Sequence, residues 1–205
     1  MSIVTREVSQ KIVVFFGRSG AGKGTQAQLL IDYLKTHDPS RRVVYVETGE
    51  RFRAFMNSGS QTAEKVKEVL RRGDLLPAFL PIWIWTQFLI DEARGGDHMI
   101  FDGVARRQEE APILDSALHF YANGTTPHIV FLDTHPDAAK QRLIKRGRFD
   151  DTHEKIDARF KWFESDVVPS VRYFEKQSHC RFVSVNGDGT VEEVFAGVKR
   201  AVGLS

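Results

Sequence analysis

A glycine-rich segment directly after an apolar run constrains this chain more than any other feature. Residues 12–16 read IVVFF, which is typical of a buried strand, and residues 17–26 read GRSGAGKGTQ, with the spacing Gly-x4-Gly-Lys. Glycines let the backbone fold back until successive N–H groups point at one centre, where Lys23 adds a positive charge. Residues 25–35 predict a helix whose N-terminal dipole favours the same anion. The order of strand, loop and helix therefore predicts a site for the phosphates of a nucleoside triphosphate.

The length and the pattern of apolar runs predict one α/β domain. The chain has 205 residues, which suffices for a single large core and is short for two ordinary domains. Helix-length segments separate the apolar runs, and this alternation favours a parallel sheet with helices on both faces. The five expected strands are residues 12–16, 43–47, 99–102, 129–133 and 182–186. Sites in such sheets lie at the carboxyl ends of the strands.

One long interval has helical composition and lacks a strand signal. It covers residues 48–94, and its three expected helices are residues 49–57, 61–72 and 81–94. A helical insertion close to a phosphate loop suggests a cap over a second substrate. Trp83 and Trp85 lie in its last helix, and we expect them to pack the insertion onto the sheet rather than to stack on a base.

Charge and composition narrow the class of protein. The 29 basic and 27 acidic side chains give a net charge of +2, without the broad positive surface that nucleic-acid binding requires. Residues 1–10 contain no apolar segment of a signal peptide, and no apolar run reaches membrane-spanning length, so we expect a cytoplasmic protein that binds no membrane. Cys180 is the single cysteine, the seven histidines show no metal-ligand spacing, and no apolar seam predicts an oligomer. We therefore expect a monomer without a disulfide or a zinc site.

Five motifs follow one another in a fixed order. They are GKGTQ at residues 22–26, TGERFR at 48–53, GDLL at 73–76, FDGVAR at 101–106 and VNGDGT at 185–190. Together they resemble the adenylate kinase family of nucleoside monophosphate kinases, from about residue 12 to the C-terminal helix. The resemblance implies a three-layer α/β sandwich of the P-loop NTPase type that transfers the γ-phosphoryl group of ATP to a nucleoside monophosphate. It divides the single domain, residues 1–205, into a core of residues 11–47, 97–142 and 160–205, an acceptor-binding insertion of residues 48–94 and a minimal lid of residues 146–151.

The resemblance also implies a role for each matching residue. The donor ATP would be bound by Gly20, Ala21, Gly22, Lys23, Gly24, Thr25, Arg142 and Gly187. The acceptor monophosphate would be bound by Thr48, Gly49, Arg53, Leu76, Gly103, Arg106 and Glu110. The catalytic residues around the transferred group would be Lys23, Arg106, Arg142, Arg146, Arg148 and Arg159. Mg²⁺ would be held by Thr25 and, through water, by Asp102, and the lid hinge would contain Asp150 and Asp151.

Arginines in this number suit phosphoryl transfer. The transferred group spreads its charge over three equatorial oxygens, and guanidinium forks stay charged and bind oxygens in pairs. Arg142 and Arg146 are four residues apart on an expected helix and therefore face the same way. Asp151 has two interpretations that do not exclude each other. It begins the sequence DTHE, which fits a capping box, and by resemblance it pairs with arginines at the lid hinge.

Two departures from the family pattern bear on function. Glu110 stands where the adenylate enzymes place a glutamine that pairs with the acceptor adenine. An ionised carboxylate only accepts hydrogen bonds, which suits the N1–H and 2-amino donors of guanine. AMP is the leading acceptor, with GMP or dGMP, or a pyrimidine monophosphate, as alternatives. The second departure is the lid, because only Gly147 separates Arg146 from Arg148.

Two other functions stay open. One is a phosphotransferase for another small acceptor, which the acceptor motifs disfavour. The other is a nucleotide-binding regulatory protein that keeps the fold with little or no transfer activity. Val104 and Ala105 replace the usual Phe-Pro before Arg106, and a missing proline leaves that turn less rigid.

Overall fold

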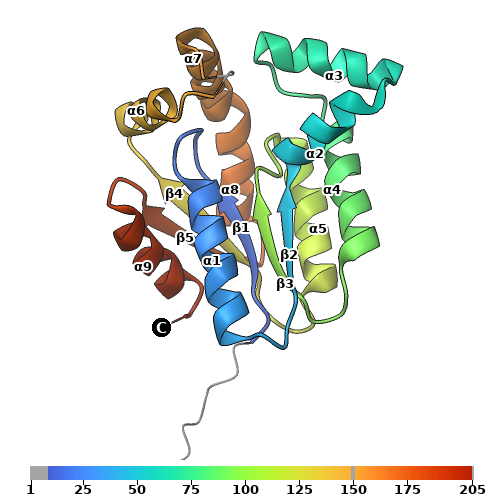
Figure 1. The fold of residues 1–205 in the computed structure, drawn as a ribbon. Coiled ribbons are helices and arrows are strands. Elements are labelled where there is room, and N and C mark those ends of the chain that lie inside the picture. Colours follow the sequence, from blue (N-terminus) through green and yellow to red (C-terminus); the bar gives the residue numbers. More distant parts are fainter. Residues whose placement is uncertain (1–8, 149–150, 205) are drawn as a thin grey trace, which may run out of the picture.

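The computed structural model describes residues 9–148 and 151–204 as a three-layer α/β sandwich (Figure 1). Within these ranges the sheet has five parallel strands in the order β2-β3-β1-β4-β5. The strands are β1 (Ile12–Phe16), β2 (Val43–Glu47), β3 (His98–Asp102), β4 (His128–Asp133) and β5 (Arg181–Asn186). The predicted parallel sheet of five strands is confirmed. Three strands begin one residue earlier than predicted because their first residue is polar and so falls outside the apolar run.

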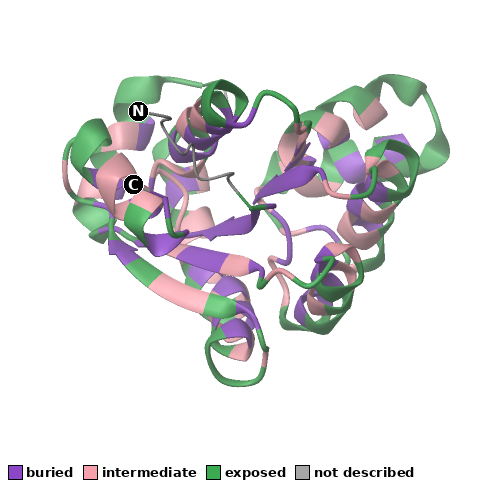
Figure 2. Ribbon diagram, turned by 90° about the horizontal axis from the view of Figure 1, so that it is seen from below, coloured by how far each residue is buried: buried purple, intermediate pink, exposed green. Residues whose placement is uncertain are grey.

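Helices cover both faces of the sheet. On one face, α1 (Lys23–His37) and α9 (Val191–Ala201) pack against Val13 and Phe15. On the other face, the helices pack against the alternate side chains of β1, and these helices are α4 (Phe79–Glu92), α5 (Ala111–Tyr121) and α8 (Val168–Lys176). Figure 2 shows most of the sheet as a purple, buried layer between helices whose outer sides are exposed, whereas the edge strand β5 is buried only at Val185. Because both faces of β1 are covered, its apolar run is unbroken.

The remaining helices stand at the carboxyl ends of the strands (Figure 1). On one side lie α2 (Thr48–Phe55), the 3₁₀ turn η1 (Met56–Ser58) and α3 (Gln61–Arg72), and on the other lie α6 (Pro136–Arg146) and α7 (His153–Trp162). The 3₁₀ turn η2 (Gln108–Glu110) precedes α5, and the π-helical turn η3 (Phe163–Val167) joins α7 to α8. The strand order reverses beside β1, so the loop after β1 opens at the point where α/β sheets bind ligands.

The helices of the insertion differ from their predicted bounds mainly at their ends. The prediction for α3 is confirmed without change, whereas α4 begins at Phe79, two residues before Pro81. Proline is tolerated there because the first turn of a helix needs no intrahelical N–H donors. None of the helices in residues 9–148 and 151–204 combines the length and the apolar composition that crossing a membrane requires.

Candidate active site

A cavity of about 1620 Å³ opens at the carboxyl ends of the strands. Its lining comes from the glycine-rich loop, the helical insertion, α6, α7 and the segment after β5. Every described residue that the sequence assigned to a site lines this cavity, except Asp151, which lies behind two of the lining arginines. Asp150 lies outside the described residues. The cavity therefore collects residues that are up to 175 positions apart, from Ser19 to Val194, at one edge of the sheet.

The glycine-rich loop curls around the amino end of α1. Gly20 and Gly22 have positive φ angles of 86° and 92°, which favour glycine, and Gly22 directly precedes the helix. Lys23 donates hydrogen bonds from Nζ to the carbonyl oxygens of Gly17 at 2.8 Å and Arg18 at 3.2 Å. The ammonium group is thus held over the loop, and the first N–H groups of α1 point into the same space.

Positive charge dominates around Lys23. Burial lowers the pKa of Lys23 to about 8; the charge of Asp102 opposes this shift, whereas Arg106, Arg146 and Arg159 add to it. An ammonium group with a lowered pKa among guanidinium groups marks a region of positive potential that an anion stabilises. This is the electrostatic character that a triphosphate site requires.

Thr25 and Asp102 offer oxygen ligands beside the loop. Asp102 ends β3 and is paired in register with Phe15 of β1, so its carboxylate lies next to the loop. A Cβ atom built on Gly24 would be 3.4 Å from Oδ2 of Asp102. Thr25 lies in the first turn of α1 and lines the cavity. A hydroxyl and a carboxylate close to a phosphate site fit the oxygen donors that Mg²⁺ prefers.

The carboxylate of Asp151 orders two arginines of the cavity. It accepts hydrogen bonds from Nε and Nη2 of Arg146, both at 2.9 Å, and from Nη2 of Arg159 at 2.7 Å. Its side chain is 0% exposed. Burial by itself opposes ionisation, but the hydrogen bonds from Arg146 and Arg159 lower the pKa of Asp151 to about 2. The carboxylate is therefore ionised at neutral pH and fixes both guanidinium groups.

Helix α7 is capped by a different residue from the one that the DTHE sequence suggested. The side chain of Thr152 accepts the N–H of Lys155 at 3.4 Å, and α7 begins at His153. The capping interpretation of Asp151 is therefore wrong. The reason is one of register, since Thr152 occupies the N-cap position and leaves Asp151 one residue outside the helix, where it reaches the arginines.

Arg142 joins α6 to the segment after β5. Its Nη1 donates to the carbonyl oxygen of Gly187 at 2.8 Å, and its Nη2 lies 3.5 Å from that of Gly189. A Cβ on Gly187 would clash with the hydroxyl of Thr134 and would be 3.1 Å from the carbonyl oxygen of Asp133, so the close packing depends on glycine. Arg142 and Arg146 line the same cavity from one side of α6, as their spacing predicted.

On the insertion side, the carbonyl group of Gly103 organises two side chains. It accepts Nε of Arg106 at 2.9 Å and the hydroxyl of Thr48 at 2.8 Å. Gly103 has a φ of 75°, and a Cβ there would be 2.7 Å from Nη2 of Arg106. The guanidinium of Arg106 also lies 6.0 Å from the ring centroid of Trp162. These contacts leave Arg106 directed into the cavity.

Glu47 is a cavity residue that the sequence analysis missed. Its carboxylate accepts the N–H of Glu50 at 2.6 Å, which caps α2, and lies 3.6 Å from Nη2 of Arg53. A Cβ on Gly49 would be 2.7 Å from Oε1 of Glu47, so the glycine makes room for the carboxylate. The position of Glu47 at the end of an expected strand, directly before the insertion, was the sequence signal that could have identified it as a cavity residue.

Comparison with known proteins identifies the family of this chain. A family model described as adenylate kinase matches residues 15–179. The adenylate kinase of Phenylobacterium zucineum is 33% identical over 196 residues, which cover 93% of this chain and 96% of that protein. Adenylate kinase 1 of a Nostoc species is 31% identical over 191 residues, 93% of this chain and 98% of that protein. The chain belongs to the adenylate kinase family.

As a member of the adenylate kinase family, the protein is a phosphotransferase of the nucleoside monophosphate kinase type. Its relatives include a uridylate kinase of Saccharomyces cerevisiae, 29% identical over 198 residues, which cover 93% of this chain and 90% of that protein. The adenylate kinase family thus includes relatives named for different acceptor bases. The residues around the base must be considered individually.

In this adenylate kinase family member, Glu110 is a buried residue of the cavity lining. Glu110 is 1% exposed. Its Oε1 accepts a hydrogen bond from the N–H of Arg107 at 3.1 Å, whereas Oε2 has no hydrogen-bond partner among the described residues. Burial raises the pKa of Glu110 to about 7, although Arg106 and Arg107 act in the opposite direction. A carboxyl group with this pKa is present in both neutral and ionised forms near neutral pH.

Arg107 and Trp162 hold the GDLL loop, and sequence reasoning missed both. Arg107 donates to the carbonyl oxygens of Leu76 at 3.0 Å and Leu75 at 3.2 Å, and to Asp166 at 3.0 Å. Trp162 donates from Nε1 to the carbonyl oxygen of Gly73 at 3.2 Å. These bonds join residues that are 31, 32, 59 and 89 positions apart in the chain, so spacing gives no hint of them.

The prediction that the tryptophans pack the insertion onto the sheet holds for one of the two. Trp85 is 0% exposed and belongs to the core beneath the sheet, which confirms it. Trp83 is 44% exposed and lies edge-on to Phe55 within the insertion, with ring centroids 5.4 Å apart, so the prediction is wrong for Trp83. Neither tryptophan lines the cavity.

Proposed function

We propose that the protein catalyses the reversible transfer of the γ-phosphoryl group of ATP to AMP, which gives two molecules of ADP. The observation that carries this proposal is the single large cavity, which joins the glycine-rich loop to the acceptor motifs with arginines between them. Two substrates can lie end to end there, so their reacting oxygen and phosphorus atoms meet without a covalent enzyme intermediate.

The donor half of the site is the loop with its neighbours. The loop N–H groups and Lys23 bind the β- and γ-phosphates, while Arg142 and Gly187 lie at the adenine side. Mg²⁺, when bound, neutralises phosphate charge, and we assign it to Thr25 and, through water, to Asp102. Gly20, Ala21, Gly22 and Gly24 complete the donor site through their backbone.

The arginines stabilise the group in transit. Arg146 and Arg159 approach from α6 and α7 and are fixed by Asp151, and Arg148 lies two residues after Arg146. Fixed cations lower the barrier because they need no rearrangement as charge spreads over the equatorial oxygens. The attacking atom is an anionic phosphate oxygen of the acceptor, so the protein supplies no general base. Arg53 and Arg106 orient that phosphate.

The protonation state of Glu110 explains how a glutamate can serve an AMP site. A neutral carboxyl group presents an O–H donor beside a C=O acceptor, as a glutamine amide presents N–H beside C=O. It can donate to N1 of adenine and accept from the 6-amino group. Burial of Glu110, with Oε2 unpaired and a pKa near 7, supports this neutral form. Thr48, Gly49, Leu76 and Gly103 form the rest of the acceptor site.

GMP is the second candidate acceptor, favoured by the same carboxyl group in its ionised form. A carboxylate accepts two hydrogen bonds side by side and therefore suits the N1–H and 2-amino groups of guanine. The two candidates differ by one proton on Glu110.

The domain division remains part of the proposal. We assign residues 48–94 to acceptor binding and residues 146–151 to a minimal lid on the single domain of residues 1–205. The cytoplasmic location and the monomeric state stay predictions.

A coupled assay for ADP with Mg·ATP and each of AMP, GMP, CMP and UMP tests the proposal. We expect AMP to be the best acceptor at neutral pH. Lys23→Ala should lower turnover by orders of magnitude, and Lys35→Ala, an exposed lysine in the last turn of α1, should leave it unchanged. ADP formation from a different small acceptor, or tight binding of a bisubstrate dinucleotide without turnover, would overturn the assignment in favour of another kinase or a regulatory protein.

A further inference from the structure

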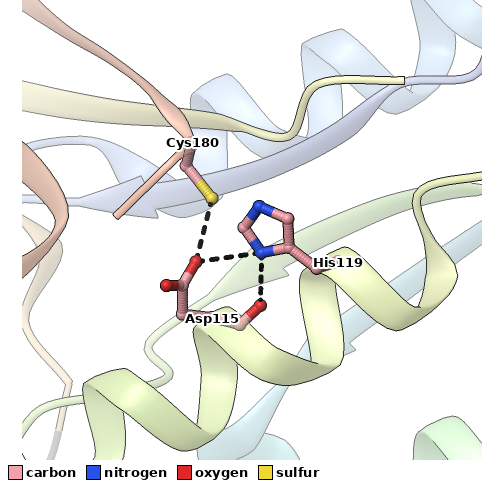
Figure 3. Close-up of side chains that lie close together, drawn as sticks. All are labelled: Asp115, His119 and Cys180. Carbon is pink, nitrogen blue, oxygen red and sulfur yellow. Dashed lines mark hydrogen bonds and ion pairs between the residues drawn. The ribbon is translucent and has the colours of Figure 1, made fainter. Parts of the chain in front are cut away.

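Three potential metal ligands of different chemistry gather far from the nucleotide cavity (Figure 3). Asp115 and His119 lie one turn apart on α5, and Cys180 directly precedes β5. None of the three lines the cavity. Because β5 begins at Arg181, the group stands at the amino end of the sheet, opposite the proposed active site. Its role must therefore be sought outside phosphoryl transfer.

The ligand atoms already have the separations of a metal site. Oδ1 of Asp115 is 3.4 Å from Sγ of Cys180 and 3.2 Å from Nδ1 of His119, and the three ligand atoms of the group lie within 4.8 Å of one another. With zinc–ligand bonds of about 2.0 to 2.3 Å, the edges of a tetrahedron are about 3.3 to 3.8 Å. Figure 3 shows the thiol and the imidazole on the same side of the carboxylate. The Nδ1–H group of His119 donates to the backbone carbonyl oxygen of Asp115 at 2.8 Å, so metal binding requires the imidazole to release this hydrogen bond and its proton, or to turn and offer Nε2.

The surrounding residues orient the carboxylate. Oδ1 of Asp115 also accepts the hydroxyl of Ser178 at 2.7 Å, and Oδ2 accepts the hydroxyl of Tyr173 at 3.0 Å. Such bonds to a ligating carboxylate fix its direction in metal sites. His179 places its ring edge-on to that of His119, with centroids 6.3 Å apart, so a further nitrogen stands beside the group. The pattern exceeds what a simple helix-to-loop contact needs.

We propose that Asp115, His119 and Cys180 bind a zinc ion, with the fourth position open to water. A thiolate and an imidazole select a borderline-soft cation, whereas Mg²⁺ prefers oxygen ligands alone, so the Mg²⁺ that accompanies ATP does not compete here. The ion connects α5 to the turn before β5. Zinc therefore stabilises the fold at this end of the sheet, away from the reacting nucleotides.

Binding exchanges a proton for the metal. The thiolate is the form of cysteine that binds zinc, so formation of the Zn–S bond releases the thiol proton of Cys180 to solvent.

Titration of the whole protein with Co²⁺, followed by displacement with Zn²⁺, tests this site. Tetrahedral cobalt gives visible d–d bands, and a Co–thiolate bond gives a near-ultraviolet charge-transfer band. We expect both bands with the wild-type protein, at one Co²⁺ per chain. Cys180→Ser should abolish the charge-transfer band, and His119→Ala should weaken Zn²⁺ binding about tenfold or more, as loss of a ligand does. Absence of the charge-transfer band in the wild type, or its persistence in Cys180→Ser, overturns the proposal.

A matched histidine and a thermal readout control the experiment. His37 makes the same bond as His119, from its Nδ1 to the carbonyl oxygen four residues earlier at 2.8 Å, but on α1. His37→Ala should leave Zn²⁺ affinity unchanged. Zinc should raise the Tm of the wild type and not that of Cys180→Ser, because binding to the folded state alone stabilises it. Equal zinc affinity of the His37 and His119 variants, or an equal shift of Tm in wild type and Cys180→Ser, contradicts the site.

Discussion

The carboxylate of Asp151 binds the guanidinium of Arg146 with both oxygens, each at 2.9 Å. One of these oxygens also accepts Arg159 at 2.7 Å. The pair connects the end of α6 to α7 across the short lid, so the positions of two proposed catalytic arginines depend on one buried carboxylate. A bidentate pair sets the angle of the guanidinium plane as well as its distance. The short lid can therefore still present well-ordered arginines.

Loss of the Asp151 charge should lower kcat more than it weakens the binding of the substrates. Asp151→Asn keeps the size of the side chain but not the two-oxygen acceptor, so Arg146 and Arg159 lose their alignment. We expect kcat to fall roughly tenfold to a hundredfold, with a smaller change in KM for ATP and AMP. Asp157→Asn is the matched control, because Asp157 is an aspartate of α7 that pairs with a lysine, Lys140, at 2.8 Å. Equal kcat in the two variants would refute the role given to Asp151.

The ion pairs of Asp151 should also make the free energy of unfolding decrease at acidic pH. The pKa of Asp151 is lowered from 3.8 to about 2, so the ionised form is favoured by folding. Its contribution is present above about pH 4 and is lost as the pH falls toward about 2. Urea unfolding of wild type and Asp151→Asn should show a difference in the free energy of unfolding that shrinks over this range. A difference that stays constant with pH excludes the carboxylate as its source.

The preference between AMP and GMP should depend on pH through Glu110. Its pKa is raised to about 7, so the neutral form that suits adenine dominates below this pH and the ionised form that suits guanine dominates above it. The ratio of kcat/KM for AMP to that for GMP should fall as the pH rises through about 7. Glu110→Gln should favour AMP at all pH values and remove this dependence.

The exposed neighbour Glu109 provides the control for that experiment. Glu109→Gln should retain the pH dependence of the wild type. Glu110→Gln should also raise the Tm above pH 7, because a folded-state pKa raised from 4.5 to about 7 means that ionisation of the buried group lowers stability as the pH rises. A wild-type AMP-to-GMP ratio that is flat with pH rules out the protonation model.

The sequence predicted the sheet and the donor loop because both are local patterns. An apolar run such as residues 12–16 reports burial on two faces, and the loop that follows is contiguous, so its geometry follows from its glycines. Strand starts were missed where polar residues such as His98 and His128 begin the pairing. Family resemblance supplied the distant arginines and the pairing of Asp151 with arginines, but not which two of them Asp151 holds.

Partners that lie far apart in the chain were beyond sequence reasoning. Asp151 was assigned to a cap as readily as to arginines, because both interpretations fit its neighbours. The seven histidines gave no zinc signal, since His119 meets Cys180 only through the packing of α5 against the end of α8. A ligand pair one turn apart, such as Asp115 and His119, was the available local signal. It gains meaning only when the fold brings the third ligand, 65 positions from Asp115, alongside.

Gly103 should be required for the position of Arg106. In Gly103→Ala, the new Cβ would be 2.7 Å from Nη2 of Arg106 and 3.3 Å from the hydroxyl of Thr48, so both side chains must shift. We expect KM for AMP to rise roughly tenfold, with KM for ATP unchanged, because a displaced guanidinium binds the acceptor phosphate less well. Steady-state kinetics with each substrate varied in turn measures the two constants.

The variant Gly59→Ala is the control that separates the clash with Arg106 from backbone strain. It has a φ of 71°, close to the 75° of Gly103, but a Cβ there meets nothing within 4 Å. Gly59→Ala should therefore cost a similar free energy of unfolding, about 1 to 2 kcal/mol, without changing KM for AMP. If Gly103→Ala raises KM for AMP no more than Gly59→Ala does, Arg106 does not bind the acceptor phosphate in the proposed arrangement. Because the two variants share the backbone cost, any excess in KM belongs to the clash with Arg106 and Thr48.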